Sequence, residues 1–175
     1  MRSLDDHLYT KGKKRILSLD GGGVRGLITI GMLDELEQQL AARFASHYEA
    51  NGKTRDDFRL CDYFDLIGGT SAGGIIAAML ALGLKASEIR DIYKKMCPRV
   101  FKGRQRFSDR FFNPYCLFKP SFDALEFERA VDEIMALVLK RAGRTGHAEP
   151  LLDTDLMRTG VAMVTSGPAA TIRRR

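Results

Sequence analysis

Two glycine-rich turns place the strongest constraint on how this chain folds. The first covers residues 20–26 (DGGGVRG) and the second covers residues 68–74 (GGTSAGG). Each turn follows a short apolar run, at 16–19 and at about 63–67, and precedes a run with apolar residues at helical spacing. Short apolar runs that end at charged residues or glycine are typical of buried strands. The sequence therefore predicts two strand–turn–helix units.

The second turn contains the pattern Gly69-x-Ser71-x-Gly73, which is the spacing of a nucleophile elbow. In such a turn a serine lies between a strand and a helix with its hydroxyl exposed, and small flanking residues let the two elements approach closely. The pattern predicts Ser71 as a nucleophile. Because so short a pattern also occurs by chance, the prediction gains weight only from the strand before it and the helix after it.

The first turn is suited to stabilise the charge that such a nucleophile creates. A serine that attacks an ester or amide carbonyl builds negative charge on the oxygen, which requires preorganised donors nearby. The backbone N–H groups of Gly22 and Gly23 are the predicted donors, since glycine lets the backbone turn inward without a side chain. The helix that follows adds its positive N-terminal end. Arg25 is expected to steady the loop or to attract an anionic substrate.

Apolar periodicity and capping residues predict the remaining elements. The first expected helix runs from residue 27 to the Asn51-Gly52 turn, with an apolar face of Leu33, Leu36, Leu40 and Phe44. The second covers 74–82 and stops at Gly83, and the third covers 87–96 with Ser87 as its N-cap and Pro98 as its end. The fourth covers 123–141 with Asp123 as its cap and an apolar stripe of Leu125, Val131, Ile134, Met135 and Val138. Residues 161–164 are predicted as a third strand.

Alternation of strands and helices favours a parallel sheet with helices on both faces, so the predicted fold is a three-layer α/β/α sandwich with a mostly parallel sheet. In such sheets the working site lies at the carboxyl ends of the strands. Both glycine turns are expected there. Residues 1–14 are a polar segment, and residues 15–175 are expected to form the domain.

Composition fits one globular domain, with 45% apolar and 29% charged residues. A net charge of +6 leaves an anionic partner open. Three widely spaced cysteines favour a reducing compartment, and no His/Cys/Asp set has metal-ligand spacing. No signal peptide is visible, which favours a cytoplasmic location. Residues 67–84 carry no charge, but their five glycines favour a strand end, an elbow and a buried helix over a membrane span.

The residues 20–26 and 69–73, in this order, resemble the motifs of patatin-like phospholipases, and the similarity runs from about residue 14 to residue 158. The resemblance implies a lipid acyl hydrolase with a phospholipid or other acyl-lipid substrate, a serine–aspartate dyad without histidine, and no cofactor. It implies that Ser71 is the nucleophile and that the glycines at 21–23 (Gly21, Gly22 and Gly23) form the oxyanion hole. The supporting motif positions are Asp20, Arg25, Gly26, Gly69 and Gly73.

The chain departs from the family pattern at the dyad aspartate. No Asp-Gly-Gly or Asp-Gly-Ala motif follows Ser71, and the single Asp-Gly pair is Asp20-Gly21 in the first turn. We therefore expect a domain that is incomplete at its C-terminus, with an unassigned base. Asp153 and Asp155 are the nearest late acids, and neither is assigned.

A histidine base is formally available. His147, with Asp123 or Asp132 before it, meets the Ser…Asp…His order of α/β-hydrolases. His147 lies in a Gly/Arg-rich loop, where a surface histidine is the ordinary expectation.

Two further functions stay open. The first is a non-catalytic lipid- or membrane-binding remnant of the domain. The second is a nucleotide-binding α/β domain, which requires an acidic residue at a strand end about 20 residues after the first turn, where 41–51 instead indicates a helix end and a turn. Residues 99–119 mix basic and aromatic side chains, which fits either a packed surface loop or peripheral contact with a membrane; no nucleic-acid partner is expected.

Overall fold

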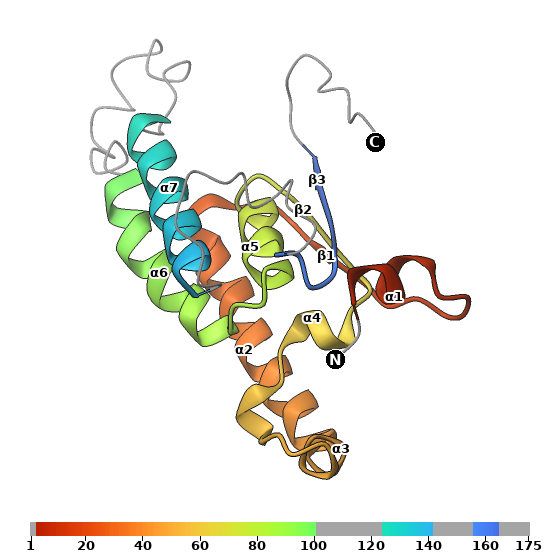
Figure 1. Ribbon diagram of the computed structural model, residues 1–175. Coiled ribbons are helices and arrows are strands. Elements are labelled where there is room, and N and C mark those ends of the chain that lie inside the picture. Colours follow the sequence, from red (N-terminus) through yellow and green to blue (C-terminus); the bar gives the residue numbers. More distant parts are fainter. Residues whose placement is uncertain (1–2, 101–123, 142–155, 165–175) are drawn as a thin grey trace, which may run out of the picture.

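The structure is a computed structural model that describes residues 3–100, 124–141 and 156–164, in which helices alternate with three strands (Figure 1). The elements are α1 Leu4–Tyr9, β1 Ile16–Leu19, the 3-10 turn η1 Gly23–Arg25, α2 Gly26–Arg43, α3 Ala45–Ala50, the 3-10 turn η2 Arg55–Asp57, α4 Leu60–Tyr63, β2 Leu66–Thr70, α5 Ala72–Ala81, α6 Ala86–Val100, α7 Ala124–Arg141 and β3 Gly160–Val164.

The three strands form one parallel sheet in the order β1-β2-β3. Leu19 at the end of β1 pairs in register with Gly69 of β2, and Gly69 pairs with Met163 of β3. The parallel order, the first strand and the third strand are confirmed. The carboxyl ends of β1 and β2 therefore lie side by side, where the two glycine turns begin.

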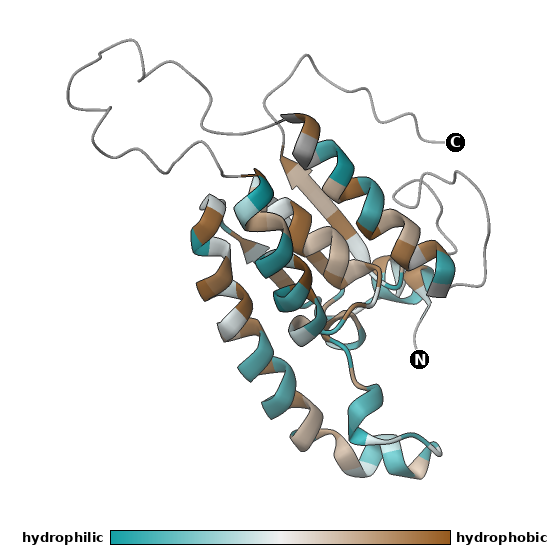
Figure 2. Cartoon of the chain, turned by 90° about the vertical axis from the view of Figure 1, so that its left-hand side faces the viewer, coloured by the Kyte–Doolittle hydropathy of each residue, from teal (hydrophilic) through white to brown (hydrophobic). Residues whose placement is uncertain are grey.

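Helix α5 is the centre of the fold. Every residue of α5 except Ile75 is buried, and the helix contacts all three strands. Helices α2 and α6 pack against each other beyond it, α7 packs on α6, and α1 touches β3 on the other side of the strands (Figure 1). In Figure 2 hydrophobic residues gather on the strands and α5, while the outward faces of the helices carry most hydrophilic residues. The mixed α/β fold is confirmed, and it is consistent with a three-layer arrangement.

Residues 67–84, the uncharged stretch, are divided between the end of β2, the elbow and the ten-residue helix α5, as predicted. None of the helices in the described ranges is long and apolar enough to cross a membrane. The predicted helix stop at Gly83 is confirmed, since Gly83 has a φ of 85°.

The polar segment 1–14 contains a helix that the sequence analysis missed. Ser3 and Asp6 form a capping box at the start of α1, in which each side chain accepts the backbone N–H of the other residue. His7 is buried, and its Nδ1 lies 3.0 Å from Oδ1 of the buried Asp65. This long-range contact fixes α1 against the start of β2.

One strand boundary and one side chain differ from the predictions. The second strand begins at Leu66 and not at Tyr63, because Leu60–Tyr63 form a helical turn in which Asp62 accepts the N–H of Arg59 at 3.0 Å. The prediction that Leu125 lies in the buried stripe of α7 is wrong, since its side chain is 56% exposed, whereas Ile134 is buried.

Helix α6 was wrongly predicted at both ends. Ser87 is not its N-cap, because the helix begins at Ala86, whose N–H is accepted by Glu37, and the carboxylate of Glu88 accepts the N–H of Lys85. Pro98 lies inside the helix, which continues to Val100. A proline there removes one backbone hydrogen bond. Burial of Val100 and the Arg99–Glu133 ion pair, at 2.9 Å, favour the extra turn.

Glu37 of α2 is a buried carboxylate that connects three helices. It accepts the backbone N–H of Leu60 at 3.3 Å and of Ala86 at 2.8 Å, which are the first residues of α4 and α6. Burial raises the pKa of the Glu37 carboxyl, and these two amides partly offset that rise.

Substitution of Glu37 tests this connection. Glu37→Ala leaves two buried N–H groups without an acceptor, so we expect it to lower the free energy of unfolding by about 2 kcal/mol or more. The two N–H groups are accepted by different oxygens of Glu37, so Glu37→Gln keeps an acceptor for one of them and turns an NH2 group toward the other, and it should recover only part of the loss. The control is Glu35→Ala on the exposed face of α2, and urea unfolding is the measurement. Equal stability of the Glu37→Ala and Glu35→Ala variants would contradict this role.

Candidate active site

The fold brings the two glycine turns into direct contact. The N–H of Gly21 donates to the Thr70 hydroxyl at 3.1 Å, and a Cβ placed on Gly21 would lie 3.0 Å from Cβ of Ser71. Residues 21 and 71 are far apart in the sequence, so the contact depends on the pairing of β1 with β2. Ser71 and the glycine loop therefore lie next to each other at the carboxyl ends of the strands, as the sequence predicts.

Ser71 has an unusual backbone conformation. Its φ is 52° and its ψ is −126°, and within the described ranges it is the one residue other than glycine with a positive φ. Such conformations cost about 1–3 kcal/mol and persist where the surroundings enforce them, often at functional sites. Ser71 is exposed and immediately precedes α5, with its carbonyl accepting the N–H of Gly74 at 2.9 Å. This is the geometry of a nucleophile elbow.

The glycines on either side of Ser71 are required by close backbone packing. A Cβ on Gly73 would lie 2.4 Å from the carbonyl oxygen of Leu19, at the end of β1. A Cβ on Gly69 would lie 2.4 Å from the carbonyl of Gly73. Real Cβ atoms do not approach backbone atoms this closely, so any side chain at either position would push β1, β2 and α5 apart.

The first turn forms a compact loop in front of α2. Arg25 donates its N–H to the carbonyl of Gly22 at 3.1 Å, which closes the 3-10 turn, and Gly23 has a φ of 54°. Asp20, Gly21, Gly22 and Arg25 are exposed, whereas Gly26 is buried at the start of α2. The predicted loop-to-helix arrangement is present.

Tyr93 of α6 contacts this loop from its buried side, and the sequence analysis missed this contact. Its side chain is fully buried, and its hydroxyl donates to the carbonyl of Gly23 at 2.6 Å. A Cβ on Gly26 would lie 2.6 Å from the same hydroxyl, so the glycine gives the tyrosine room. Burial raises the pKa of Tyr93 to about 12, so the hydroxyl, protonated at neutral pH as in any tyrosine, stays a donor further into the alkaline range. No local pattern around residue 93 indicates this contact.

The residues considered as bases do not meet Ser71 in the described parts of the chain. Asp123, His147, Asp153 and Asp155 lie outside those parts, and Asp132 is exposed on α7. No hydrogen bond joins the Ser71 hydroxyl to an acid or a histidine among the residues in view. Among the same residues, no three His, Cys, Asp or Glu side chains lie close enough together to hold a metal ion.

A nucleotide site at residues 20–26 would need a strand in the stretch 41–51, and this stretch is largely helical. Helix α2 runs to Arg43, and α3 follows at Ala45–Ala50. This agrees with the sequence analysis and counts against that alternative.

The strain at Ser71 can be measured by substitution. Glycine adopts a positive φ without a Cβ penalty, so Ser71→Gly should be about 1 kcal/mol more stable than Ser71→Ala despite the greater freedom of glycine in the unfolded chain. The same pair at Ser87, in the first turn of α6, should not show this advantage of glycine, since a helical residue has a negative φ and glycine is a poorer helix former than alanine. Urea unfolding of the four variants provides the comparison. A Ser71→Gly variant no more stable than Ser71→Ala would show that the turn is unstrained.

Removal of the Tyr93 hydroxyl should loosen the first turn. Tyr93→Phe removes the side-chain donor to the Gly23 carbonyl, which still accepts the N–H of Gly26, so we expect a loss of about 1 kcal/mol in the free energy of unfolding. Amide hydrogen exchange in residues 22–26 should become faster, while exchange in α5 changes little. Tyr9→Phe, at a side chain that is 77% exposed, is the control. Unchanged exchange in residues 22–26 would argue against a role for Tyr93 in holding the loop.

Comparison with known proteins places this arrangement in a family. The family model of patatin-like phospholipases matches residues 17–168. A cGAMP-activated phospholipase of Vibrio cholerae is 37% identical over 129 residues, which are 72% of this chain and 34% of that protein. Patatin-like protein 2 of Arabidopsis thaliana is 44% identical over 93 residues, or 49% of this chain and 20% of the relative. Patatin-T5 of Solanum tuberosum is 38% identical over 94 residues, which are 50% of this chain and 22% of that protein.

The chain spans about a third or less of the length of these relatives. The family match nevertheless covers both glycine turns, all three strands and the helices between them. By this match, the chain belongs to the patatin-like phospholipase family.

Proposed function

We propose that this chain carries the nucleophile and the oxyanion hole of a lipid acyl hydrolase. Ser71 is the nucleophile, and the backbone N–H groups of Gly22 and Gly23 are the main donors, with Gly21 in the same loop. The observation that carries the proposal is the strained, exposed backbone of Ser71 in contact with Gly21. Relatives named phospholipases support an acyl lipid as the substrate class.

The reaction follows from this arrangement. The Ser71 Oγ attacks the carbonyl carbon of the ester, a C–O bond forms, and the carbonyl π electrons move to the oxygen, where the loop N–H groups stabilise the charge. A base accepts the serine proton and passes it to the leaving alcohol as the ester C–O bond breaks. Water then attacks the acyl-serine, the acid product leaves, and the serine regains its proton.

The base is the unassigned part of this proposal. The family resemblance implies an aspartate, and no Asp-Gly-Gly or Asp-Gly-Ala motif follows Ser71. A chain with nucleophile and oxyanion loop but without a base would bind acyl lipids and hydrolyse them slowly or not at all. We keep this non-catalytic, lipid-binding form as the alternative.

Contact with a membrane surface through residues 99–119 is a further part of the proposal. Most of this segment lies outside the described residues. Arg99 pairs with Glu133 of α7, so the support for lipid contact comes from the basic and aromatic composition of the rest.

Covalent labelling and ester hydrolysis together test whether Ser71 is an activated nucleophile. A fluorophosphonate probe reacts with an activated serine, and we expect mass spectrometry to find it on Ser71 of the folded chain. Hydrolysis of a short-chain p-nitrophenyl ester, measured in parallel, should fall by at least about 10³ in Ser71→Ala. Ser87→Ala, at a serine of α6 away from the turns, should match the unchanged chain in both assays.

The outcomes distinguish the two forms. Labelling and hydrolysis that both depend on Ser71 mean that a base is present. A chain that is folded by circular dichroism but shows neither supports the non-catalytic form. Hydrolysis that survives in Ser71→Ala would refute Ser71 as the nucleophile.

A further inference from the structure

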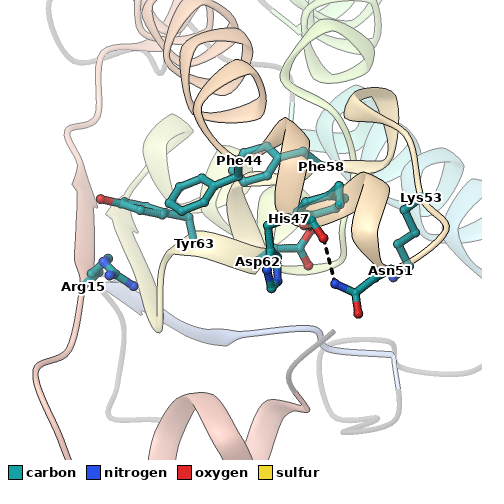
Figure 3. A pocket seen from close by; sticks show the side chains of 9 residues that line it. Arg15, Phe44, His47, Asn51, Lys53, Phe58, Asp62 and Tyr63 are labelled. Atoms are coloured by element: carbon teal, nitrogen blue, oxygen red, sulfur yellow. Dashed lines mark hydrogen bonds between the residues drawn. The ribbon is translucent and has the colours of Figure 1, made fainter.

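A hollow lies at the opposite end of the sheet from Ser71. It has a volume of about 490 Å³, within the range of small-molecule sites. Its walls come from the residue before β1, from the end of α2, from α3 and the turn after it, and from η2 and α4 (Figure 3). The lining residues are Arg15, Phe44, His47, Tyr48, Asn51, Lys53, Phe58, Asp62 and Tyr63. We call this hollow the aromatic pocket.

Four aromatic rings build the wall of the aromatic pocket. Phe44 and Phe58 are nearly parallel with their centroids 6.2 Å apart, and Tyr63 lies 5.9 Å from Phe44. The ring of Tyr48 meets Phe58 edge-on at 5.7 Å. These contacts hold the rings in fixed positions. A flat aromatic ligand that stacks on them therefore costs little side-chain entropy.

Cations lie at both ends of this wall. The Arg15 guanidinium is 4.5 Å from the Tyr63 ring centroid at one end, and Lys53 is at the other, near Asn51 (Figure 3). Neither Arg15 nor Lys53 has a carboxylate within 4.0 Å among the residues in the described ranges. The backbone of Lys53 is fixed, since its N–H donates to the carbonyl of Tyr48 at 2.9 Å.

The one carboxylate in the lining, Asp62, is already neutralised. Its Oδ1 pairs with Arg158 at 2.6 Å, and its Oδ2 accepts the Tyr48 hydroxyl at 2.8 Å. Burial and this bond raise the pKa of Tyr48, so its hydroxyl stays a donor even in the alkaline range. Asp62 therefore adds little repulsion toward an anion, and the pocket presents net positive charge beside aromatic faces.

We propose that the aromatic pocket binds a flat heteroaromatic ring that carries a phosphate, the chemistry of a nucleotide. The ring stacks on the aromatic wall, and the phosphate pairs with Lys53 or Arg15. The site is distinct from the turn at residues 20–26 and from Ser71. The inference does not rest on the proposed hydrolysis.

Titration calorimetry with ligands and their parts tests this. The four ribonucleoside monophosphates are titrated into the whole chain, together with the matching nucleosides and ribose 5-phosphate. At least one nucleotide should bind about tenfold or more tightly than either its nucleoside or ribose 5-phosphate. At least one of Lys53→Ala and Arg15→Ala, the one at the cation that holds the phosphate, should weaken that binding about tenfold and leave nucleoside binding nearly unchanged.

Matched controls keep the test independent of folding and of catalysis. Lys94→Ala, at an exposed lysine of α6, should bind the nucleotide as the unchanged chain does. Ser71→Ala should also bind it unchanged, so failure of the hydrolase proposal would leave this result standing. Lys53 is on a turn and its truncation leaves the aromatic contacts in place; circular dichroism confirms that each variant is folded.

Three results would overturn the inference. Absence of saturable binding by all four nucleotides removes the site. Binding of ribose 5-phosphate as tight as that of any nucleotide means a plain anion site, such as one for a lipid headgroup. Nucleotide binding that is unaffected by both Lys53→Ala and Arg15→Ala places the ligand elsewhere on the chain.

Discussion

The candidate site depends on backbone packed against backbone at the ends of β1 and β2. Gly73 lies against the carbonyl of Leu19, and Gly69 lies against Gly73, with no space for a side chain at either position. These contacts fix the start of α5 relative to both strands. The direction of Ser71 and its distance from the Gly21 loop therefore follow from main-chain geometry, which makes the arrangement rigid before any substrate is present.

The strained conformation of Ser71 is maintained because α5 is deeply buried. A positive φ at a serine costs about 1–3 kcal/mol, whereas burial of one large apolar side chain contributes about 1.5–3 kcal/mol. Ile76, Met79 and Leu80 are each at most 1% exposed. Their burial requires α5 to begin where it does, directly after β2, so the chain has no room to relax the turn. Tyr93 similarly holds the first turn from within the core.

What was predictable from the sequence is local, and what was missed is mostly long-range. The two turns, α5 and the third strand each have their signal within a few neighbouring residues, and all are confirmed. The Tyr93–Gly23 bond joins positions 70 residues apart, and Glu37 reaches Ala86 across 49 residues. No periodicity encodes such pairs. Glu37 and Glu88 together explain why Ser87 is not the cap of α6: the carboxylates of other residues satisfy the N–H groups there.

The aromatic pocket and the Ser71 turn are connected through one arginine. The side chain of Arg158 pairs with Asp62 in the pocket wall, and its N–H donates to the carbonyl of Ala81 at the end of α5. Ser71 immediately precedes that same helix. Loss of Asp62 would leave Arg158 unpaired and disturb both regions, so its effect on ligand binding would be ambiguous. Lys53 and Arg15 touch no part of α5 through a hydrogen bond or ion pair in the described residues. Substitutions at these two cations therefore report on the pocket alone.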